Sequence, residues 1–390
     1  MVGVDLAMPQ RRKSTLMLLP RTDQMQLDRF LDRLKRDAEL EIGYPVAFDF
    51  DYSALTPFLS FSLNNAGDPF MPMTYLLNSH EFEQEVVAFF AELAQAPDGD
   101  WWGYVTNGST EGNLYGLYLG RELLPDGIVY FSQDSHYSVG KNLHFLNMRH
   151  IMIRSQANGE IDYEDLRETL RIRRDAPPII FANIGTTMKE ARDDIVLIRS
   201  ILDDLAIESR YIHCDAALCG GYAAFLEPRP AWDFADGADS IAISGHKFIG
   251  SPIPCGIVLA RRGHVDRIGH SVAYIGSVDT TISGSRNGFT PLLLWHAIRS
   301  LGIEGLRRRI TDSLAVAAYA ERRFNEIGIA AWRNPQALTV VFPEPPQAVC
   351  DKWQLATAGG YSHIICMPHV RRDQIDSLIG DIERAEGAGP

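Results

Sequence analysis

Short apolar segments alternate with amphipathic segments between about residues 100 and 260. The apolar segments are continuous, which is typical of strands that are covered on both faces. The sequence therefore predicts an α/β fold with a mostly parallel central sheet between helices. Six strands are expected at 127–132, 150–155, 177–185, 210–216, 240–244 and 255–261, and two intervening helices at 164–174 and 194–206.

The pattern changes on both sides of this region. Residues 23–40 have the pattern of a polar helix, and we interpret residues 1–60 as an N-terminal arm. After about residue 290, a long helical pattern at 291–328 precedes two short apolar strands and a final helix. The sequence thus predicts a large domain at 61–295 and a small C-terminal α+β domain at 296–390.

Composition and charge narrow the class of partner. The 390 residues are 46% hydrophobic and 22% charged, which is typical of a globular protein, and the formal net charge is −13. This negative charge argues against nucleic acid and against anionic membrane surfaces as partners. No run approaches the roughly 18 apolar residues that a membrane span needs. We therefore expect a small-molecule partner.

The cysteines give an expectation about metals and location. They are scattered, with no CxxC pair and no zinc-type spacing to histidines, at Cys214, Cys219, Cys255, Cys350 and Cys366. The sequence therefore predicts no metal site. Unpaired thiols are typical of a reducing cytosol, so we expect a cytoplasmic protein.

The segment SIAISGHKFIGSPIPCG, residues 240–256, places a lysine where a predicted strand ends. Most lysines are solvated at the surface, and Lys247 could be one of them. Its position, the adjacent His246 and the Gly/Pro-rich loop that follows favour another interpretation, because ligands bind at the carboxyl ends of parallel strands. A lysine in such a crevice can form a Schiff base.

Asp215 lies at the end of another predicted strand, and Asn183 lies at the end of a third. A carboxylate in this position either caps the next element or binds a cationic ligand, since a buried ionised aspartate requires a partner. Pyridoxal phosphate (PLP) needs such a carboxylate, because its pyridine nitrogen is an electron sink only while protonated. Ala217 is small enough to lie beneath a flat ring.

Two further stretches are ambiguous when each is considered alone. Gly108, Ser109 and Thr110 precede a predicted helix, where N–H groups and hydroxyls can bind phosphate, although an ordinary Ser/Thr cap is commoner. His136 could be a hydrogen-bonded core histidine, or it could stack on the open face of a cofactor ring. Together with Lys247 and Asp215, these residues fit a PLP site.

In combination, these motifs resemble the group II PLP-dependent amino-acid decarboxylases, and within them the bacterial histidine decarboxylases and the plant serine decarboxylases. The matching stretches run in order from about residue 42 to 345 and include LNNAGDPF, WGYVTNGSTEGN, SQDSHYSV, IIFANIGTT, HCDAAL, SGHKFIGSPIPCGIV and TISGSRNG. The resemblance implies the aminotransferase-like fold type I, PLP as cofactor, and a homodimer or higher homo-oligomer with sites at the subunit interface.

The resemblance also implies a role for each matching residue. Lys247 forms the Schiff base, Asp215 pairs with the pyridine nitrogen, and His136 stacks on the ring. Tyr274 is the expected proton donor to the substrate carbon. The residues expected around the phosphate are Gly108, Ser109, Thr110, Ser244 and His246, with Ala217 beneath the ring, and the expected substrate contacts are Tyr75, Asn183, Phe289 and Ala337.

Four positions depart from the family pattern. One of them, Ser109, could still cap the helix or bind phosphate. Phe289 replaces a histidine, which removes a titratable donor and adds apolar volume. Ala337 replaces a serine and removes a hydroxyl. If these positions line the pocket, a polar substrate loses partners there. Glu190 replaces a glycine, and excludes any special backbone angle that glycine supplies unless the loop itself differs.

The sequence therefore predicts a PLP-dependent L-amino-acid α-decarboxylase, with L-histidine as the first expected substrate and histamine as the product. Serine decarboxylation to ethanolamine is the main alternative, because LNNAGDPF and the stretch at 353–370 also resemble the plant enzymes. An aromatic or other amino acid is a third candidate, which Phe289 favours. Cleavage of a different bond on the same cofactor stays open, since a fold does not determine which bond breaks.

Overall fold

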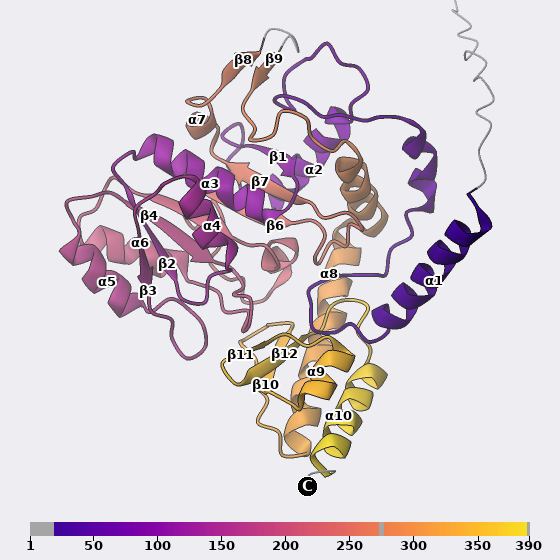
Figure 1. Ribbon diagram of the computed structural model, residues 1–390. Coiled ribbons are helices and arrows are strands. Elements are labelled where there is room, and N and C mark those ends of the chain that lie inside the picture. Colours follow the sequence, from indigo (N-terminus) through magenta and orange to yellow (C-terminus); the bar gives the residue numbers. More distant parts are fainter. Residues whose placement is uncertain (1–18, 273–276, 388–390) are drawn as a thin grey trace, which may run out of the picture. The chain divides into compact units, whose positions relative to one another are not determined.

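A seven-stranded sheet is the main element of the computed structural model, which describes residues 19–272 and 277–387 (Figure 1). The strand order is β1-β7-β6-β5-β4-β2-β3. The last five strands in this order are mutually parallel, whereas β7 runs antiparallel to both of its neighbours. The strands are β1 (Trp102–Thr106), β2 (Ile128–Ser132), β3 (His150–Ile153), β4 (Pro178–Asn183), β5 (Tyr211–Asp215), β6 (Ser240–Ser244) and β7 (Gly256–Ala260).

The predicted α/β fold is confirmed, and each of the six apolar segments forms a strand. The prediction missed β1, although all five of its residues are buried. Its sequence WGYVT contains one glycine and two aromatic residues, so it does not read as an aliphatic run. The reversed direction of β7 was not predicted either, because apolar periodicity carries no information on strand direction.

Six α-helices between residues 80 and 265 are associated with the large sheet. The longer helices associated with the sheet are α2 (His80–Leu93), α3 (Ser109–Leu123), α5 (Tyr163–Ile172) and α6 (Ile195–Asp204), and the shorter ones are α4 (Ser138–Phe145) and α7 (Arg262–Val265). The predicted helices at 164–174 and 194–206 correspond to α5 and α6, which are N-capped by Asp162 and Asp194. These carboxylates accept the first free N–H groups of each helix.

Helix α3 rests directly on the sheet because its contact face carries glycines. A Cβ atom on Gly112 would lie 2.9 Å from the Cβ atom of Ala242 in β6. A Cβ atom on Gly116 would lie 2.1 Å from Nδ1 of His213 in β5. Only glycine permits so close an approach of helix and sheet. The N-terminus of α3 is consequently fixed beside the carboxyl ends of β5 and β6.

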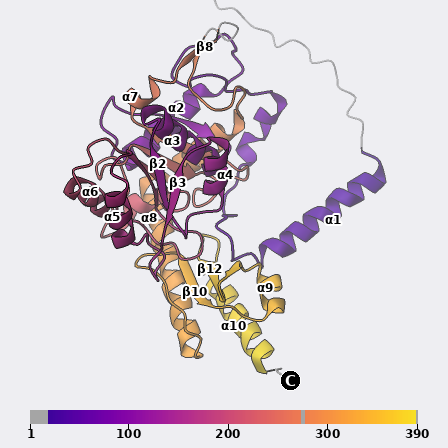
Figure 2. The same cartoon turned by 60° about the vertical axis from the view of Figure 1, so that its left-hand side comes forward.

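The C-terminal part forms a small α+β unit, as predicted, and both views show its sheet, with α9 and α10, beyond the lower edge of the large sheet (Figures 1 and 2). Its antiparallel sheet has the order β10-β12-β11. Its elements are α8 (Phe289–Glu326), β10 (Thr339–Pro343), α9 (Gln347–Trp353), β11 (Thr357–Ala358), β12 (Tyr361–Ile365) and α10 (Arg372–Gly387). Gly302 interrupts α8 with a φ of 61°. The boundary at 295/296 stays a prediction, since α8 runs across it.

The N-terminal region forms a unit of its own up to Glu41. Helix α1 (Arg21–Ala38) confirms the helix predicted at 23–40, and none of its residues is buried.

A 3₁₀ helix, η1 (Ser53–Ser60), and a two-stranded sheet of β8 (His270–Val272) and β9 (Ser277–Asp279) complete the larger elements. Among the residues that the structure describes, no helix combines the length and the apolar character that crossing a membrane requires.

Glu190 corrects one expectation. It keeps a left-handed backbone, with φ at 52°, although glutamate is not favoured in this region. Its buried carboxylate accepts hydrogen bonds from the backbone N–H groups of Leu338 (2.9 Å) and Thr339 (2.8 Å) and from the Thr339 hydroxyl (2.7 Å). Arg192 donates to the same carboxylate at 3.1 Å. These bonds to the start of β10 offset the backbone strain, which costs on the order of 1–3 kcal/mol.

We predict that Glu190→Ala lowers the free energy of unfolding by about 3 kcal/mol, because buried N–H groups lose their acceptor. Glu190→Gly should cost about 1 kcal/mol less than Glu190→Ala, since glycine suits the left-handed angle. Urea unfolding measures both values. As a control, Glu122→Ala removes an exposed carboxylate and should change stability by less than about 0.5 kcal/mol. A Gly variant as stable as the parent protein would contradict this account of Glu190.

Candidate active site

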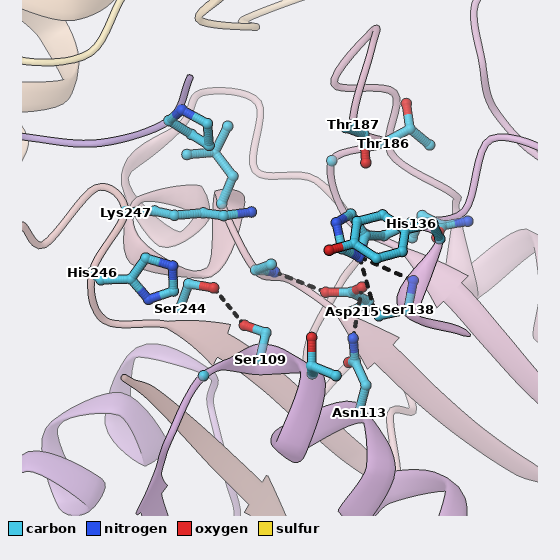
Figure 3. A pocket seen from close by; sticks show the side chains of 18 of the residues that line it. Ser109, Asn113, His136, Ser138, Thr186, Thr187, Asp215, Ser244, His246 and Lys247 are labelled. Carbon is cyan, nitrogen blue, oxygen red and sulfur yellow. Dashed lines mark hydrogen bonds between the residues drawn. The ribbon is translucent and has the colours of Figure 1, made fainter. Parts of the chain in front are cut away.

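A cavity of about 840 Å³ opens where β4, β5 and β6 end and α3 begins (Figure 3). Asn183, Asp215 and Ser244 are the last residues of these strands, and Lys247 follows three residues after β6. The structure therefore brings together residues that are far apart in the sequence. All ten of the following predicted residues line the cavity: Gly108, Ser109, Thr110, His136, Asn183, Asp215, Ala217, Ser244, His246 and Lys247.

The start of α3 forms one end of the cavity. The Ser109 and Ser244 hydroxyl oxygens lie 2.6 Å apart, and both residues are buried. Gly108 has a φ of 145°, which lets the chain turn sharply into the helix. The first N–H groups of a helix have no partner within it, and the helix dipole favours an anion there. These groups and the two hydroxyls form a donor set that suits a phosphate.

Asp215 provides a negatively charged group at the floor of the cavity. Its carboxylate accepts a hydrogen bond from Asn113 Nδ2 at 2.8 Å and one from the backbone N–H of Ala217 at 3.1 Å. Burial raises the pKa of Asp215, whereas Lys247, Asn113, Ala217 and His136 act in the opposite direction. The carboxylate is thus desolvated but held by two donors, which is the arrangement that a buried ionised aspartate requires.

Lys247 supplies an amine to the cavity. No described residue lies within hydrogen-bonding or ion-pairing distance of its Nζ atom, and Figure 3 shows the side chain extending across the cavity on the side of His246 and Ser244. Burial lowers the pKa of Lys247, and the Asp215 carboxylate partly offsets that effect. A lowered pKa increases the fraction of the uncharged, nucleophilic amine.

His136 faces Asp215 from the loop before α4. Its Nδ1 atom lies 2.8 Å from the Ser138 hydroxyl and 3.3 Å from the Ser138 backbone nitrogen. Because that backbone N–H can only donate, Nδ1 is the acceptor and a neutral ring carries its proton on Nε2. Burial lowers the pKa of His136, which favours the neutral ring.

Three other predicted residues lie outside the cavity. Tyr75 is exposed and its hydroxyl donates to the carbonyl of Ser62, at 3.0 Å. Phe289 begins α8, and Ala337 is fully buried just before β10. None of these three residues lines the cavity in this chain, so their contacts with a substrate stay predictions. Tyr274 lies outside the described residues.

Sequence reasoning missed several residues of the site. Asn113 follows Ser109 by four positions, so the helical period could have placed it on the same face. The segment Gly43–Val46 and residues Ala356 and Ile365 also line the cavity. His363 also lines the cavity, and it connects two segments of the chain, because its ring nitrogens lie 3.1 Å from the carbonyl oxygens of Met188 and Gly43. Periodicity gives no signal for contacts between such distant segments.

The residues present fit PLP. The donor set at the start of α3 suits its phosphate, and the amine of Lys247 suits its aldehyde. The carboxylate of Asp215, which the Asn113 amide and the Ala217 N–H hold, suits a protonated pyridine nitrogen. All three groups line one cavity.

Comparison with known proteins agrees with this chemistry. The model of the pyridoxal-dependent decarboxylase conserved domain matches residues 121–328. A histidine decarboxylase of Mesorhizobium japonicum is 52% identical over 365 residues, which cover 94% of this chain and 99% of that protein. A histidine decarboxylase of Morganella morganii is 50% identical over 369 residues, which cover 94% and 98% of the two chains.

Solved structures share the fold. An L-methionine decarboxylase from Streptomyces sp. 590, in its internal aldimine form, superposes with a TM-score of 0.85 at 26% identity over 95% of this chain and 98% of that chain. A glutamate decarboxylase from Lactobacillus brevis superposes with a TM-score of 0.79 at 18% identity, over 97% and 95% of the two chains. The predicted fold type I is thus confirmed.

Proposed function

Because the chain belongs to the pyridoxal-dependent decarboxylase family, we propose that it removes the α-carboxylate of L-histidine and releases histamine and CO2. Membership of the family makes the protein a PLP-dependent amino-acid decarboxylase. The proposal of histidine as the substrate rests on the sequence identity of about 50%, over 94% of the chain, with enzymes named histidine decarboxylase. The cavity supports this proposal through the chemistry of its lining.

We assign the cofactor to the residues whose chemistry fits each of its groups. The start of α3 with Ser109 and Ser244 would hold the phosphate, Lys247 the aldehyde carbon, and Asp215 the ring nitrogen. PLP supplies an electron sink for the pair of electrons that remains on Cα when the carboxylate leaves as CO2. The protein residues then have two tasks, which are to orient the substrate and to move protons.

Lys247 and His136 are the described groups that could move those protons. Burial lowers the pKa of Lys247, which increases the fraction of its amine that is uncharged and can accept a proton. The neutral ring of His136 carries a proton on Nε2, because Ser138 occupies Nδ1. By resemblance, Tyr274 is the expected donor to Cα, and this role stays part of the proposal.

The charges around the cavity favour loss of the carboxylate. Lys247 is the one lysine in the described lining, and that lining contains no arginine. An α-carboxylate beside the lining residues Val46, Leu218 and Ile365 therefore has no guanidinium partner, and a poorly solvated carboxylate is closer in energy to neutral CO2. The same lining offers no guanidinium to an acidic side chain, which favours a neutral one such as imidazole.

Asn183 supports a substrate side chain that carries a hydrogen-bond donor. Its amide nitrogen lies 3.0 Å from the Ser132 hydroxyl and 3.1 Å from the Asp193 carboxylate, and these contacts use both of its hydrogens. The amide oxygen is left to accept a hydrogen bond at the cavity wall. Imidazole presents an N–H donor to such an acceptor, whereas an apolar side chain would leave it unpaired.

We also propose that two copies of the chain associate, and that they do so in the cytoplasm. Leu59 is 70% exposed and Leu76 is 85% exposed, and they belong to an apolar group in the stretch 58–77 that also contains Phe61 and Leu77. Exposed apolar groups of this kind mark interfaces, and family resemblance makes a second copy the expected partner. All five cysteines are unpaired thiols, which supports a reducing compartment.

The first prediction from this proposal concerns Lys247. Borohydride reduction of the holoenzyme should fix the cofactor mass on the peptide that contains Lys247, and Lys247→Ala should lower kcat by more than about 1000-fold. Peptide mass spectrometry and CO2 release measure the two effects. Lys352→Ala, which removes a lysine outside the cavity, is the control and should leave both unchanged. Cofactor mass on another lysine would refute the assignment.

The second prediction concerns the substrate. We expect kcat/KM for L-histidine to exceed that for L-serine, L-phenylalanine, L-methionine and L-glutamate by at least about 100-fold, because discrimination by polar contacts is of this order or larger. Purified enzyme is incubated with each amino acid, and CO2 and amine are quantified. Comparable rates on serine and histidine, or a keto acid as the product in place of amine, would overturn the proposal.

The third prediction concerns assembly. Light scattering of the wild-type protein should give at least twice the mass of the chain. The double variant Leu59→Asp/Leu76→Asp should shift toward the monomer mass, since an interface cannot bury unpaired carboxylates without cost. Ile172→Asp is a matched control, because Ile172 is 74% exposed on α5 and should not affect the mass. An unchanged mass for the double variant would exclude this surface as the interface.

A further inference from the structure

The Asp215 carboxylate is the end of a longer chain of hydrogen bonds. Asn113 on α3 is 1% exposed, and its Nδ2 atom donates to Asp215 Oδ2 at 2.8 Å. Its Oδ1 atom lies 2.9 Å from Nε2 of His213. An amide oxygen can only accept, so Nε2 of His213 carries the proton. The amide orientation is thereby fixed, with its nitrogen toward the carboxylate.

The direction of donation continues beyond His213. With its proton on Nε2, the ring accepts at Nδ1, which lies 2.7 Å from the Ser240 hydroxyl oxygen. Ser240 must therefore donate to the ring, and its oxygen accepts from the Tyr211 hydroxyl at 2.8 Å. Every donor from Tyr211 to Asn113 points toward Asp215. Aligned dipoles of this kind favour a negative charge at the end of the chain.

This chain of hydrogen bonds lies in the core, where burying polar groups costs desolvation free energy. Ser240 and His213 are completely buried, and Tyr211 is 1% exposed. Gly116 leaves the space in which the His213 ring lies, since a Cβ atom there would be 2.1 Å from the ring. Burial lowers the pKa of His213 to about 3, so the ring remains neutral and transmits orientation rather than charge. Apolar residues would fill this volume without any need for hydrogen bonds.

We infer that Asn113 and His213 are positioning residues that keep the Asp215 carboxylate ionised and oriented toward the ring nitrogen of the cofactor. Asn113 contacts the carboxylate, and His213 acts through Asn113 by fixing the direction of its amide. The other charged or titratable groups that face Asp215 are Lys247 and His136, and neither hydrogen-bonds to it. The inference rests on the role proposed above for Asp215.

Protonation of the ring nitrogen provides a direct test. Holoenzyme is reconstituted with PLP labelled with ¹⁵N at the ring nitrogen, and the ¹⁵N chemical shift is followed from pH 6 to 9. In the wild-type enzyme, the shift should report a protonated nitrogen throughout. In Asn113→Leu, the midpoint for loss of that proton should fall below pH 9, so that deprotonation of the ring nitrogen is observed within this range. His213→Phe should move it in the same direction by less, and serves as the second variant if Asn113→Leu does not fold.

Two controls separate the possible failures. Asp215→Asn should lose the ring proton at lower pH than any other variant. Asn334→Leu removes another buried asparagine, which bonds the carbonyls of Asn158 and Lys189, and should leave the ¹⁵N shift as in the wild type. If Asp215→Asn loses the proton while both Asn113→Leu and His213→Phe retain it, the inference about Asn113 and His213 is wrong, whereas the proposed role of Asp215 stands. If Asp215→Asn retains the proton, the proposed role of Asp215 falls and the inference falls with it.

Discussion

The close packing of α3 on the central sheet is the constraint on which the site depends. Gly112 and Gly116 allow the helix to approach β6 and β5 more closely than any side chain would permit. This approach places the first turn of α3 beside the end of β6, where Ser109 meets Ser244. It also places Asn113, one turn further along, against Asp215. One helix thus contributes to both the phosphate end and the carboxylate end of the cavity.

Burial of charge sets the chemistry of these groups. Asp215 and Lys247 are both desolvated, which raises the pKa of the acid and lowers the pKa of the amine. Each effect alone would favour the neutral pair and would weaken the carboxylate as a partner for a cation. The positive charge of Lys247 and the N–H donors of Asn113 and Ala217 act against this effect and favour the charged carboxylate. The amine receives no such donor or acceptor from the described residues, so it is free for covalent chemistry.

The sequence predicted the parts of the fold that depend on local periodicity. Aliphatic runs identified six of the seven strands of the large sheet, and the predicted strand ends pointed to Asn183, Asp215 and Lys247, which line one cavity. Strand β1, the direction of β7, and the contacts of His363 with Gly43 and Met188 were not predicted, since they depend on pairing between distant segments. Glu190 was misjudged because its backbone angle is offset by bonds to β10 that no local pattern reveals.

The residues proposed for the chemistry and the rest of the cavity lining come from different parts of the chain. The groups proposed for the reaction lie at the ends of the large sheet and at the start of α3, whereas Gly43–Val46, Ala356 and Ile365 form a wall from elsewhere in the chain. Glu190 ties the small sheet to the loop after β4, and His363 ties the segment at Gly43 to the same loop. This wall can change without disturbing the ends of the strands. The same fold at 26% identity in an enzyme named L-methionine decarboxylase is consistent with that separation. Selectivity for an amino acid is therefore best sought in the wall.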